Sequence, residues 1–297
     1  MRTFQHIAAL RTYLHGMRDE GKTVGLVPTM GALHEGHLSL FNRANSDCDL
    51  TVATIFVNPT QFGRNEDFDA YPRDLNHDLQ LASNAGVGAV FHPSVDELYP
   101  AGFQTTIALL QISSMLEGAH RPGHFEGVAT IVNKLFNIVQ PDRAYFGMKD
   151  YQQLTLIEKM VSDLNLHLDI VAIPTMRDAN GLALSSRNKY LSPEEKQAAL
   201  VLHKTLKKAE SALLDGETDP ATLLASLNSE IDAEPLVKRD YLELVNPETL
   251  LPVSTLSDAT TLVVMAVRIG KTRLIDNLLV APAGIKPVRF KKRETAG

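Results

Sequence analysis

The chain has 297 residues, more than one domain usually contains, so two domains are expected. Its 44% apolar and 22% charged residues are typical of a soluble globular protein, and its formal net charge of −6 argues against a protein whose main task is to bind nucleic acid. The single cysteine, Cys48, excludes an intramolecular disulfide framework and favours a reducing compartment, by default the cytoplasm. Charged residues interrupt the first 20 positions and no apolar run approaches the roughly 20 residues of a membrane span, so neither a signal peptide nor a membrane segment is predicted.

The first half of the chain alternates short β-rich runs with helical patterns. In chain order we predict strand 23–27, helix 36–44, strand 50–57, helix 74–85, strand 87–91, helix 127–139, strand 143–146, helix 150–164 and strand 168–173. Such alternation implies crossover connections and a parallel sheet that helices cover on both faces. The expected fold class is therefore α/β, with a Rossmann-like doubly wound parallel sheet.

The pattern changes after about Tyr190. Two helices are predicted at 193–214 and 218–231, the first opened by Ser192 as N-cap and Pro193 in the first turn. Strands follow at 240–245, 261–269 and 272–279, with a hairpin corner at Gly270. We therefore predict a second, smaller α+β domain and place the domains at 1–182 and 183–297. The basic stretch 286–293 is expected to be a solvated end.

The most informative stretch is 28–37, Pro-Thr-Met-Gly-Ala-Leu-His-Glu-Gly-His, where the first predicted strand is followed by the first helix. In an open parallel sheet this connection lies at the carboxyl edge, where ligands bind. Backbone N–H groups at a helix N-terminus, the glycine at 36 and the imidazoles of His34 and His37 are suited to phosphates, and either imidazole can become cationic beside a polyphosphate.

Three other interpretations of this stretch carry less weight. Two solvated turn histidines are a common occurrence, but the position directly after a strand argues against them here. A zinc site has neither His-Glu-x-x-His spacing nor an obvious third ligand, and Gly-x-Gly-x-x-Gly, the dinucleotide fingerprint, is absent. The His-x-Gly-His pattern resembles the signature of the adenylyl-transferring superfamily that includes class I aminoacyl-tRNA synthetases and small nucleotidyltransferases.

Two later stretches can supply further phosphate-binding groups. In Gly147-Met148-Lys149-Asp150, the lysine suits phosphate oxygens and the aspartate can position Mg²⁺ or a nucleotide. Leu184-Ser185-Ser186-Arg187 combines hydroxyl donors with a guanidinium, which suits a polyphosphate leaving group. Alone, the latter is typical of an ordinary polar linker; its place after the other two motifs favours the functional interpretation.

Further motifs at 56–62, 121–125, 140–143, 149–153, 185–188, 240–243 and 272–277 complete a pattern that covers about residues 1–280. In order and spacing, the whole set resembles the pantothenate synthetase family, the pantoate–β-alanine ligases. The sequence departs from the family's usual pattern at Met148, where Glu is frequent, and at Leu184, where Met is frequent.

The resemblance implies an ATP-dependent ligase that condenses pantoate with β-alanine through a pantoyl-adenylate, with Mg²⁺, no protein-bound metal, no nucleic-acid or membrane partner, and a homodimeric cytoplasmic enzyme. The first domain would bind ATP and pantoate, and the second would act as a lid. The implied catalytic residues are His37, His34, Lys149 and Arg187, and the implied pantoate-binding residues are Gln61, Gln153 and Asn58. The residues implied to contact ATP are Met30, Gly31, Ala32, Leu33, His34, Glu35, Gly36, His37, Gly147, Met148, Lys149, Asp150, Met176, Leu184, Ser185, Ser186 and Arg187.

Three rivals differ from this interpretation in their chemistry. A nucleotidyltransferase of the same fold would use another acceptor, and a tRNA synthetase would need an anticodon-binding region that this acidic chain does not show. A non-catalytic nucleotide-binding regulator would bind ATP without releasing pyrophosphate.

Overall fold

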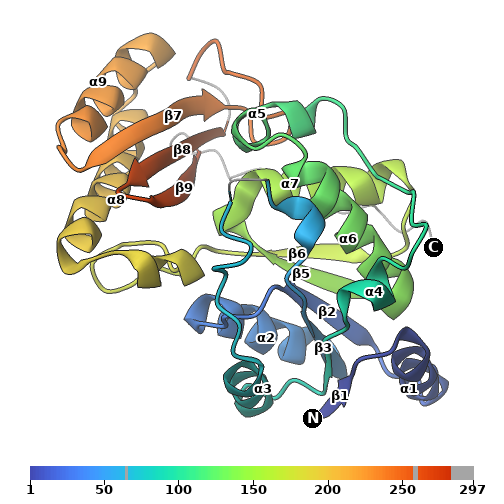
Figure 1. Ribbon diagram of the computed structural model, residues 1–297. Coiled ribbons are helices and arrows are strands. Elements are labelled where there is room, and N and C mark those ends of the chain that lie inside the picture. Colours follow the sequence, from blue (N-terminus) through green and yellow to red (C-terminus); the bar gives the residue numbers. More distant parts are fainter. Residues whose placement is uncertain (64–65, 257–259, 282–297) are drawn as a thin grey trace. The chain divides into compact units, whose positions relative to one another are not determined.

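The computed structural model describes residues 1–63, 66–256 and 260–281 (Figure 1). The chain divides into two compact units: Met1–Met176 with Leu184–Ser186, and Arg177–Ala183 with Arg187–Gly297. The predicted boundary between 182 and 183 lies within the stretch 177–187, where the chain passes from one unit to the other more than once. The ligand-binding and lid roles of the two domains stay predictions. The basic stretch 286–293 lies outside the described residues.

A parallel sheet of six strands forms the centre of the first unit, in the order β1-β4-β3-β2-β5-β6. Three of the four inner strands, β2, β3 and β4, are buried along almost their whole length, as expected for a parallel sheet covered on both faces. The strand bounds are β1 (Arg2–Phe4), β2 (Val24–Thr29), β3 (Leu50–Ile55), β4 (Ala89–Phe91), β5 (Arg143–Gly147) and β6 (Asp169–Ile173).

Helices cover both faces of this sheet (Figure 1). Helices α2 and α3 contact each other on one face, whereas α6 contacts both α1 and α7 on the other. The predicted doubly wound α/β fold is thereby confirmed. The helices are α1 (Ile7–Asp19), α2 (Glu35–Asp47), α3 (Leu75–Asn84), α4 (Val95–Leu98), α5 (Glu117–His120), α6 (His124–Val139) and α7 (Tyr151–Asp163), with the short 3₁₀ helices η1 (Pro59–Gln61), η2 (Ile112–Ser114), η3 (Met148–Asp150) and η4 (Ser186–Tyr190).

The strand order changes direction between β2 and β5. From β2 the chain moves outward through β3 and β4, and it then returns to the other side of β2 with β5 and β6. Ligands of open α/β sheets bind at this kind of switch point, outside the carboxyl ends of the strands. The segments that follow β2 and β5 are the predicted phosphate-binding stretches 30–37 and 147–150.

The second unit is a smaller α+β structure, as predicted. An antiparallel sheet of β7 (Val237–Val245), β8 (Thr261–Ile269) and β9 (Thr272–Val280) packs against α8 (Pro193–Leu214) and α9 (Pro220–Asp232) through a shared apolar core. Ser192 and Glu195 form a reciprocal capping box at the start of α8, and Gly270 adopts a φ of 56° at the hairpin corner.

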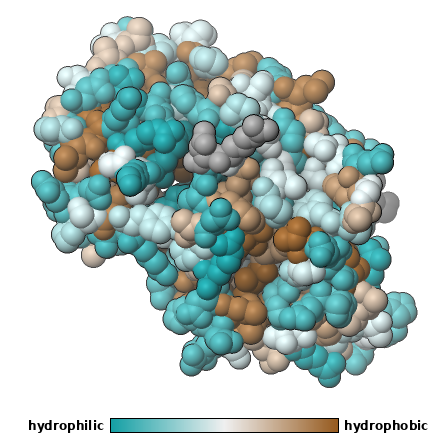
Figure 2. Space-filling view, in the orientation of Figure 1, coloured by the Kyte–Doolittle hydropathy of each residue, from teal (hydrophilic) through white to brown (hydrophobic). Residues whose placement is uncertain are grey.

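Two elements near the N-terminus are absent from the predicted set. Strand β1 has three residues, too few for a β pattern, and α1 buries only Leu10 and Leu14. In the part of the chain that the structure describes, no helix combines the length and apolarity needed to cross a membrane. Figure 2 shows hydrophilic residues over most of the visible face, with hydrophobic residues reaching the surface in scattered patches.

Candidate active site

The turn between β2 and α2 is organised by two histidine side chains. His34 has extended backbone angles at the N-cap of α2, and its Nδ1 accepts a hydrogen bond from the Gly36 N–H at 3.1 Å. The Nδ1 atom of His37 accepts in turn from the His34 N–H at 3.3 Å. The two imidazoles thus form a capping box, and their ring centres lie 4.2 Å apart.

In the neutral form of each ring, this capping box fixes the tautomer. A backbone N–H can only donate, so the Nδ1 atom of each histidine carries no proton. The proton of each neutral imidazole is therefore on Nε2. Both side chains can offer an Nε2–H donor without being cationic.

Lys149 and Asp150 lie close enough to His37 to affect its titration. Burial and the neighbouring His34 lower the pKa of His37 to about 3; Asp150 opposes this shift, and Lys149 adds to it. His37 is therefore neutral at pH 7 in the ligand-free chain. Lys149 Nζ lies 3.8 Å from Asp150 Oδ1 and is largely shielded from solvent. The structure thus brings His34, His37, Lys149 and Asp150 together, as the sequence predicts.

The backbone of the turn is less available to a ligand than expected. Of the seven N–H groups from 31 to 37, only that of Glu35 has no acceptor among the described residues. The other six donate within the protein: Gly31, Ala32, Leu33, His34, Gly36 and His37. Side chains, rather than a row of backbone amides, are the principal donors of this turn.

Asp78 holds the turn from α3, a role that no motif in the sequence predicts. Its carboxylate accepts from the N–H groups of Ala32 at 2.9 Å and Leu33 at 2.8 Å, and its side chain is buried. Ala32 has a positive φ of 51°, which costs free energy for a residue with a Cβ. Asp78 shares the buried face of α3 with Ala82, and an acid on an apolar helix face is a signal that could have revealed it.

The 3₁₀ helix η1 places Gln61 beside the histidine turn. The Gln61 side chain is 9% exposed, and its Nε2 points at the sulfur of Met30 at 3.0 Å. The preceding Asn58 is buried and hydrogen-bonded to Gln61, with Nδ2 lying 3.2 Å from Gln61 Oε1. The structure therefore joins two predicted pantoate-binding residues to the predicted ATP-binding stretch.

Two neighbouring glutamines at the start of α7 differ in their roles. Gln152 is buried. Its Oε1 accepts a hydrogen bond from the Glu117 N–H, and its Nε2 donates to the carbonyls of Ile112 and Met115, which fixes the chain around η2. The Gln153 side chain is half-buried and makes no hydrogen bond among the described residues. The amide of Gln153 is thus available to a ligand, which is compatible with the prediction.

The remaining predicted ATP-binding residues belong to several segments. The Leu184 N–H donates to the Met176 carbonyl at 2.9 Å. The side chain of Leu184 lies next to Gly36: its Cβ would be 4.0 Å from a Cβ placed on that glycine. Ser186 Oγ lies 3.4 Å from the hydroxyl of Tyr71. Glu35 is exposed at the start of α2, Gly147 ends β5, Met148 begins η3, Ser185 lies in the first unit, and Arg187 belongs to the second unit. The roles predicted for these residues stay predictions.

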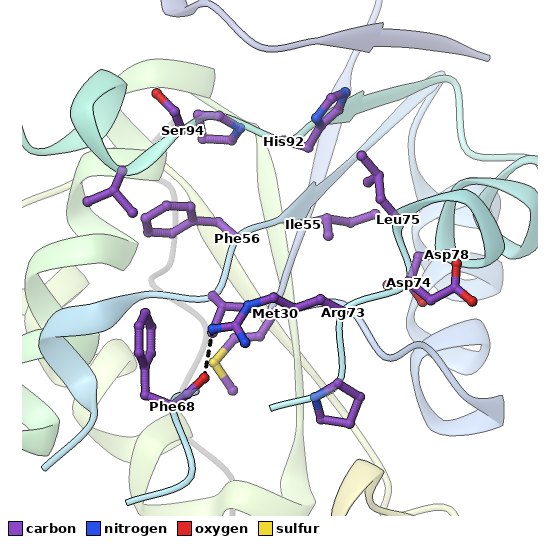
Figure 3. A pocket seen from close by; sticks show the side chains of 14 residues that line it. Met30, Ile55, Phe56, Phe68, Arg73, Asp74, Leu75, Asp78, His92 and Ser94 are labelled. Carbon is purple, nitrogen blue, oxygen red and sulfur yellow. Dashed lines mark hydrogen bonds between the residues drawn. The ribbon is translucent and has the colours of Figure 1, made fainter. Parts of the chain in front are cut away.

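A cavity of about 320 Å³ adjoins Met30 at the carboxyl ends of β2, β3 and β4. Figure 3 shows the Arg73 guanidinium directed at the carbonyl of Phe68, where the distance is 2.7 Å. Asp74 caps α3 and Asp78 holds the histidine turn. The charged side chains that line this cavity therefore form hydrogen bonds with the backbone of the protein around it. Over the described residues, no three His, Cys, Asp or Glu side chains gather as they would around a metal ion.

Comparisons with known proteins identify the family of the chain. The family model described as pantoate-beta-alanine ligase matches residues 2–279. The pantothenate synthetase of Moorella thermoacetica is 51% identical over 280 residues, which cover 94% of this chain and 99% of the relative.

Two solved structures are also similar. The pantothenate synthetase of Thermus thermophilus has 47% identity and a TM-score of 0.89, covering 94% of this chain and 99% of that one. The Francisella tularensis pantoate-beta-alanine ligase, complexed with beta-gamma ATP and beta-alanine, has 35% identity and a TM-score of 0.78, covering 94% and 97%. The chain belongs to the pantoate–β-alanine ligase family, and it is a ligase of pantothenate biosynthesis.

Proposed function

We propose that the chain condenses pantoate with β-alanine in two steps, with ATP as the activating substrate. In the first step the pantoate carboxylate attacks the α-phosphorus of ATP, giving pantoyl-adenylate and pyrophosphate. In the second the β-alanine amine attacks the acyl carbonyl and AMP leaves. The observation that carries this proposal is the pair of Nε2–H donors on His34 and His37, set beside Lys149 at the switch point of the sheet.

Phosphoryl chemistry of this kind depends mainly on positioning and on stabilising charge. Because His34 and His37 are held through Nδ1, their Nε2–H groups have a fixed direction before ATP binds. Lys149 adds a cation at the same place. We assign these three side chains to the oxygens of the reacting phosphates, and Ser185, Ser186 and Arg187 to the leaving pyrophosphate.

Pantoate is assigned to the neutral amides of Gln61 and Gln153. An amide donates to a carboxylate or hydroxyl oxygen without the full charge of an arginine, so the carboxylate keeps its nucleophilic character. The Gln61 amide lies against Met30 at the edge of the ATP-binding stretch, which suits a carboxylate that has to reach the α-phosphorus.

Mg²⁺ belongs to the same proposal as the partner of the ATP phosphates. Magnesium in nucleotide sites is usually held by one or two carboxylates together with phosphate oxygens. Asp150, half exposed beside Lys149, is the side chain of the turn region that fits this pattern. When bound, the ion would neutralise charge on the leaving pyrophosphate.

The order of the two steps gives the decisive test. Purified protein with ATP and Mg²⁺ is expected to exchange labelled pyrophosphate into ATP when pantoate is present and β-alanine is withheld. A binding protein would show no exchange, a nucleotidyltransferase for another acceptor would not respond to pantoate, and a tRNA synthetase would respond to an amino acid instead. Pantoate labelled with ¹⁸O in its carboxylate is expected to transfer one label to AMP once β-alanine is added. Label in phosphate would instead indicate an acyl phosphate and refute the adenylate.

A cytoplasmic location is proposed from the single cysteine.

A homodimer is the proposed assembly. Residues 103–110, Phe-Gln-Thr-Thr-Ile-Ala-Leu-Leu, run without helix or strand, and the Leu110 side chain is 90% exposed. Within this segment only the N–H groups of Phe103 and Ile107 find acceptors among the described residues. A second copy that covers this stretch would pair its backbone. Light scattering is expected to give a dimer for the protein and a monomer for Leu110→Lys; an unchanged dimer in the variant would move the interface elsewhere.

A further inference from the structure

The orientation of the buried Asn58 amide is determined by its neighbours. The carbonyl of Gly127 can only accept, so Nδ2 of Asn58 is the atom that faces it, at 3.1 Å. The N–H of Thr60 can only donate, so the atom that faces it is Oδ1. The two protons of Nδ2 then go to Gly127 and to Gln61 Oε1, which leaves no N–H on this side chain for a substrate.

The orientation of Asn58 sets the orientation of Gln61. Since Asn58 donates to it, the facing atom of Gln61 is the carbonyl oxygen Oε1. The Nε2 group of Gln61 therefore lies on the opposite side, toward Met30. A thioether is a weak acceptor, and among the described residues Nε2 has no other partner. Gln61 thus presents N–H donors, not an acceptor, to the candidate substrate position.

Tyr99 holds the other end of this arrangement. Its hydroxyl donates to Asn58 Oδ1 at 2.9 Å, the shortest hydrogen bond that this oxygen accepts; the hydroxyl of Thr60 donates to it at 3.0 Å. Burial raises the pKa of the Tyr99 phenol, although its hydrogen bonds to Thr60 and Asn58 act in the other direction, so the phenol stays a donor at neutral pH. An amide oxygen that is held by two hydroxyl donors does not exchange places with its NH₂ group without losing both.

The backbone of Gln61 is fixed by separate contacts. The Nδ1–H of His124 donates to the Gln61 carbonyl at 2.8 Å, and Arg121 donates to the other ring nitrogen of His124 at 3.0 Å. A Cβ added to Gly127 would come within 2.4 Å of the Thr60 carbonyl, so α6 lies directly against η1. Removing the Tyr99 hydroxyl therefore removes a hydrogen bond that orients the Asn58 and Gln61 side-chain amides, while these backbone contacts remain.

We infer that Tyr99 and Asn58 are positioning residues, which turn the Gln61 amide so that its N–H groups face an acceptor oxygen of pantoate. This inference rests on the proposed function and adds to it the direction of the hydrogen bond and the side chains that impose it. The hydrogen bonds run from Tyr99 to Asn58 and from Asn58 to Gln61. Pantoate offers carboxylate and hydroxyl oxygens that can accept the next one.

The test compares Tyr99→Phe with a matched control in the pantoate-dependent exchange of pyrophosphate into ATP. Tyr99→Phe removes one net hydrogen bond from the chain and is expected to raise the pantoate requirement about three- to tenfold, with kcat and the ATP requirement unchanged. Tyr13→Phe makes the same chemical change on α1, where the hydroxyl has no hydrogen bond among the described residues, and is expected to match the wild type. In the Gln61→Ala background, Tyr99→Phe should have no further effect, because the group it orients is gone.

Each outcome decides for or against the inference. A wild type without pantoate-dependent exchange would refute the proposed function itself. If the wild type does exchange, three results would overturn the positioning role: an unchanged pantoate requirement in Tyr99→Phe, a rise that persists in the Gln61→Ala background, or an equal rise in the ATP requirement. Should Tyr99→Phe unfold early in a thermal melt, Thr60→Val removes the second hydroxyl donor to Asn58 Oδ1 and has to raise the pantoate requirement in the same direction.

Discussion

Replacing His37 by asparagine or by glutamine should separate its two roles. The carbonyl oxygen of an asparagine lies roughly where Nδ1 of a histidine lies, so His37→Asn keeps an acceptor for the His34 N–H and removes the Nε2–H donor. The longer amide of a glutamine places an N–H₂ roughly at Nε2, so His37→Gln keeps a donor and loses the cap. If the donor serves catalysis and the acceptor serves the fold, the two variants should fail in different assays.

The structure gives the expected size of each effect. The hydrogen bond at Nδ1 is 3.3 Å long and neutral, so its loss in His37→Gln should lower the free energy of unfolding by about 0.5–1.5 kcal/mol. Loss of one preorganised donor to developing charge costs about 10²–10³ in rate. We therefore expect His37→Asn to slow adenylation by about 10² or more at near wild-type stability, and His37→Gln to retain the larger share of the rate.

Single-turnover formation of pantoyl-adenylate measures the rate, and urea unfolding followed by circular dichroism measures the stability. His15→Asn and His15→Gln are matched controls, since this side chain is 80% exposed on α1, and both are expected to behave as the wild type. Equal adenylation rates in His37→Asn and the wild type would remove the Nε2–H of His37 from the mechanism. Slower adenylation in His37→Gln than in His37→Asn would reverse the assignment of the two nitrogens.

Three other changes test separate parts of the site. Lys149→Ala should raise the ATP requirement and slow the chemical step together, with the pantoate requirement little changed, which steady-state kinetics with each substrate varied can check. Gln61→Glu should raise the pantoate requirement more than Gln61→Ala does, since it replaces a donor by a negatively charged acceptor; a smaller rise in Gln61→Glu would contradict the donor assignment. The pKa of His37 is about 3 in the folded chain, against an ordinary value of 6.5 in the unfolded chain. Between these two pH values the unfolded chain binds a proton that the folded chain does not bind. The free energy of unfolding should therefore fall as pH falls from about 6.5 toward 3. Urea titrations at several pH values should show a shallower fall in His37→Asn, and an identical fall would assign the acid sensitivity to other groups.

Much of the fold could be predicted because its elements have strong local patterns. The bounds of α8 and β8 agree with the predicted 193–214 and 261–269 to the residue, since Ser192 and Pro193 mark the helix start and Gly270 marks the strand end. Helix α6 begins three residues earlier than predicted, at His124. The preceding Gly123, with a φ of 83°, forms its N-cap without a side-chain acceptor, so no capping residue marks this start in the sequence.

The candidate site could be located from the sequence, but its hydrogen bonds could not. Strand-to-helix connections and the order of the motifs place His34, His37 and Lys149 at one sheet edge, where the structure also has them. The contributions of Asp78 and Tyr99 depend on contacts across 45 and 41 positions in sequence, and no local pattern encodes such contacts. Which atom of an amide or imidazole faces a ligand is likewise settled only by the partners of its other atoms.

The same principle operates on both sides of the site. At the histidine turn, backbone N–H groups occupy Nδ1 of His34 and His37 and so leave Nε2–H as the donor. At η1, Asn58 occupies Oε1 of Gln61 and so leaves Nε2 as the donor. In each case the protein satisfies one polar atom of a two-ended side chain internally and thereby fixes the character of the other. Because such donors need no reorganisation when a ligand arrives, they are suited to negative charge even on an uncharged side chain. A site built in this way should discriminate against ligands that present N–H groups at these positions, since two donors would then face each other across a partly buried contact.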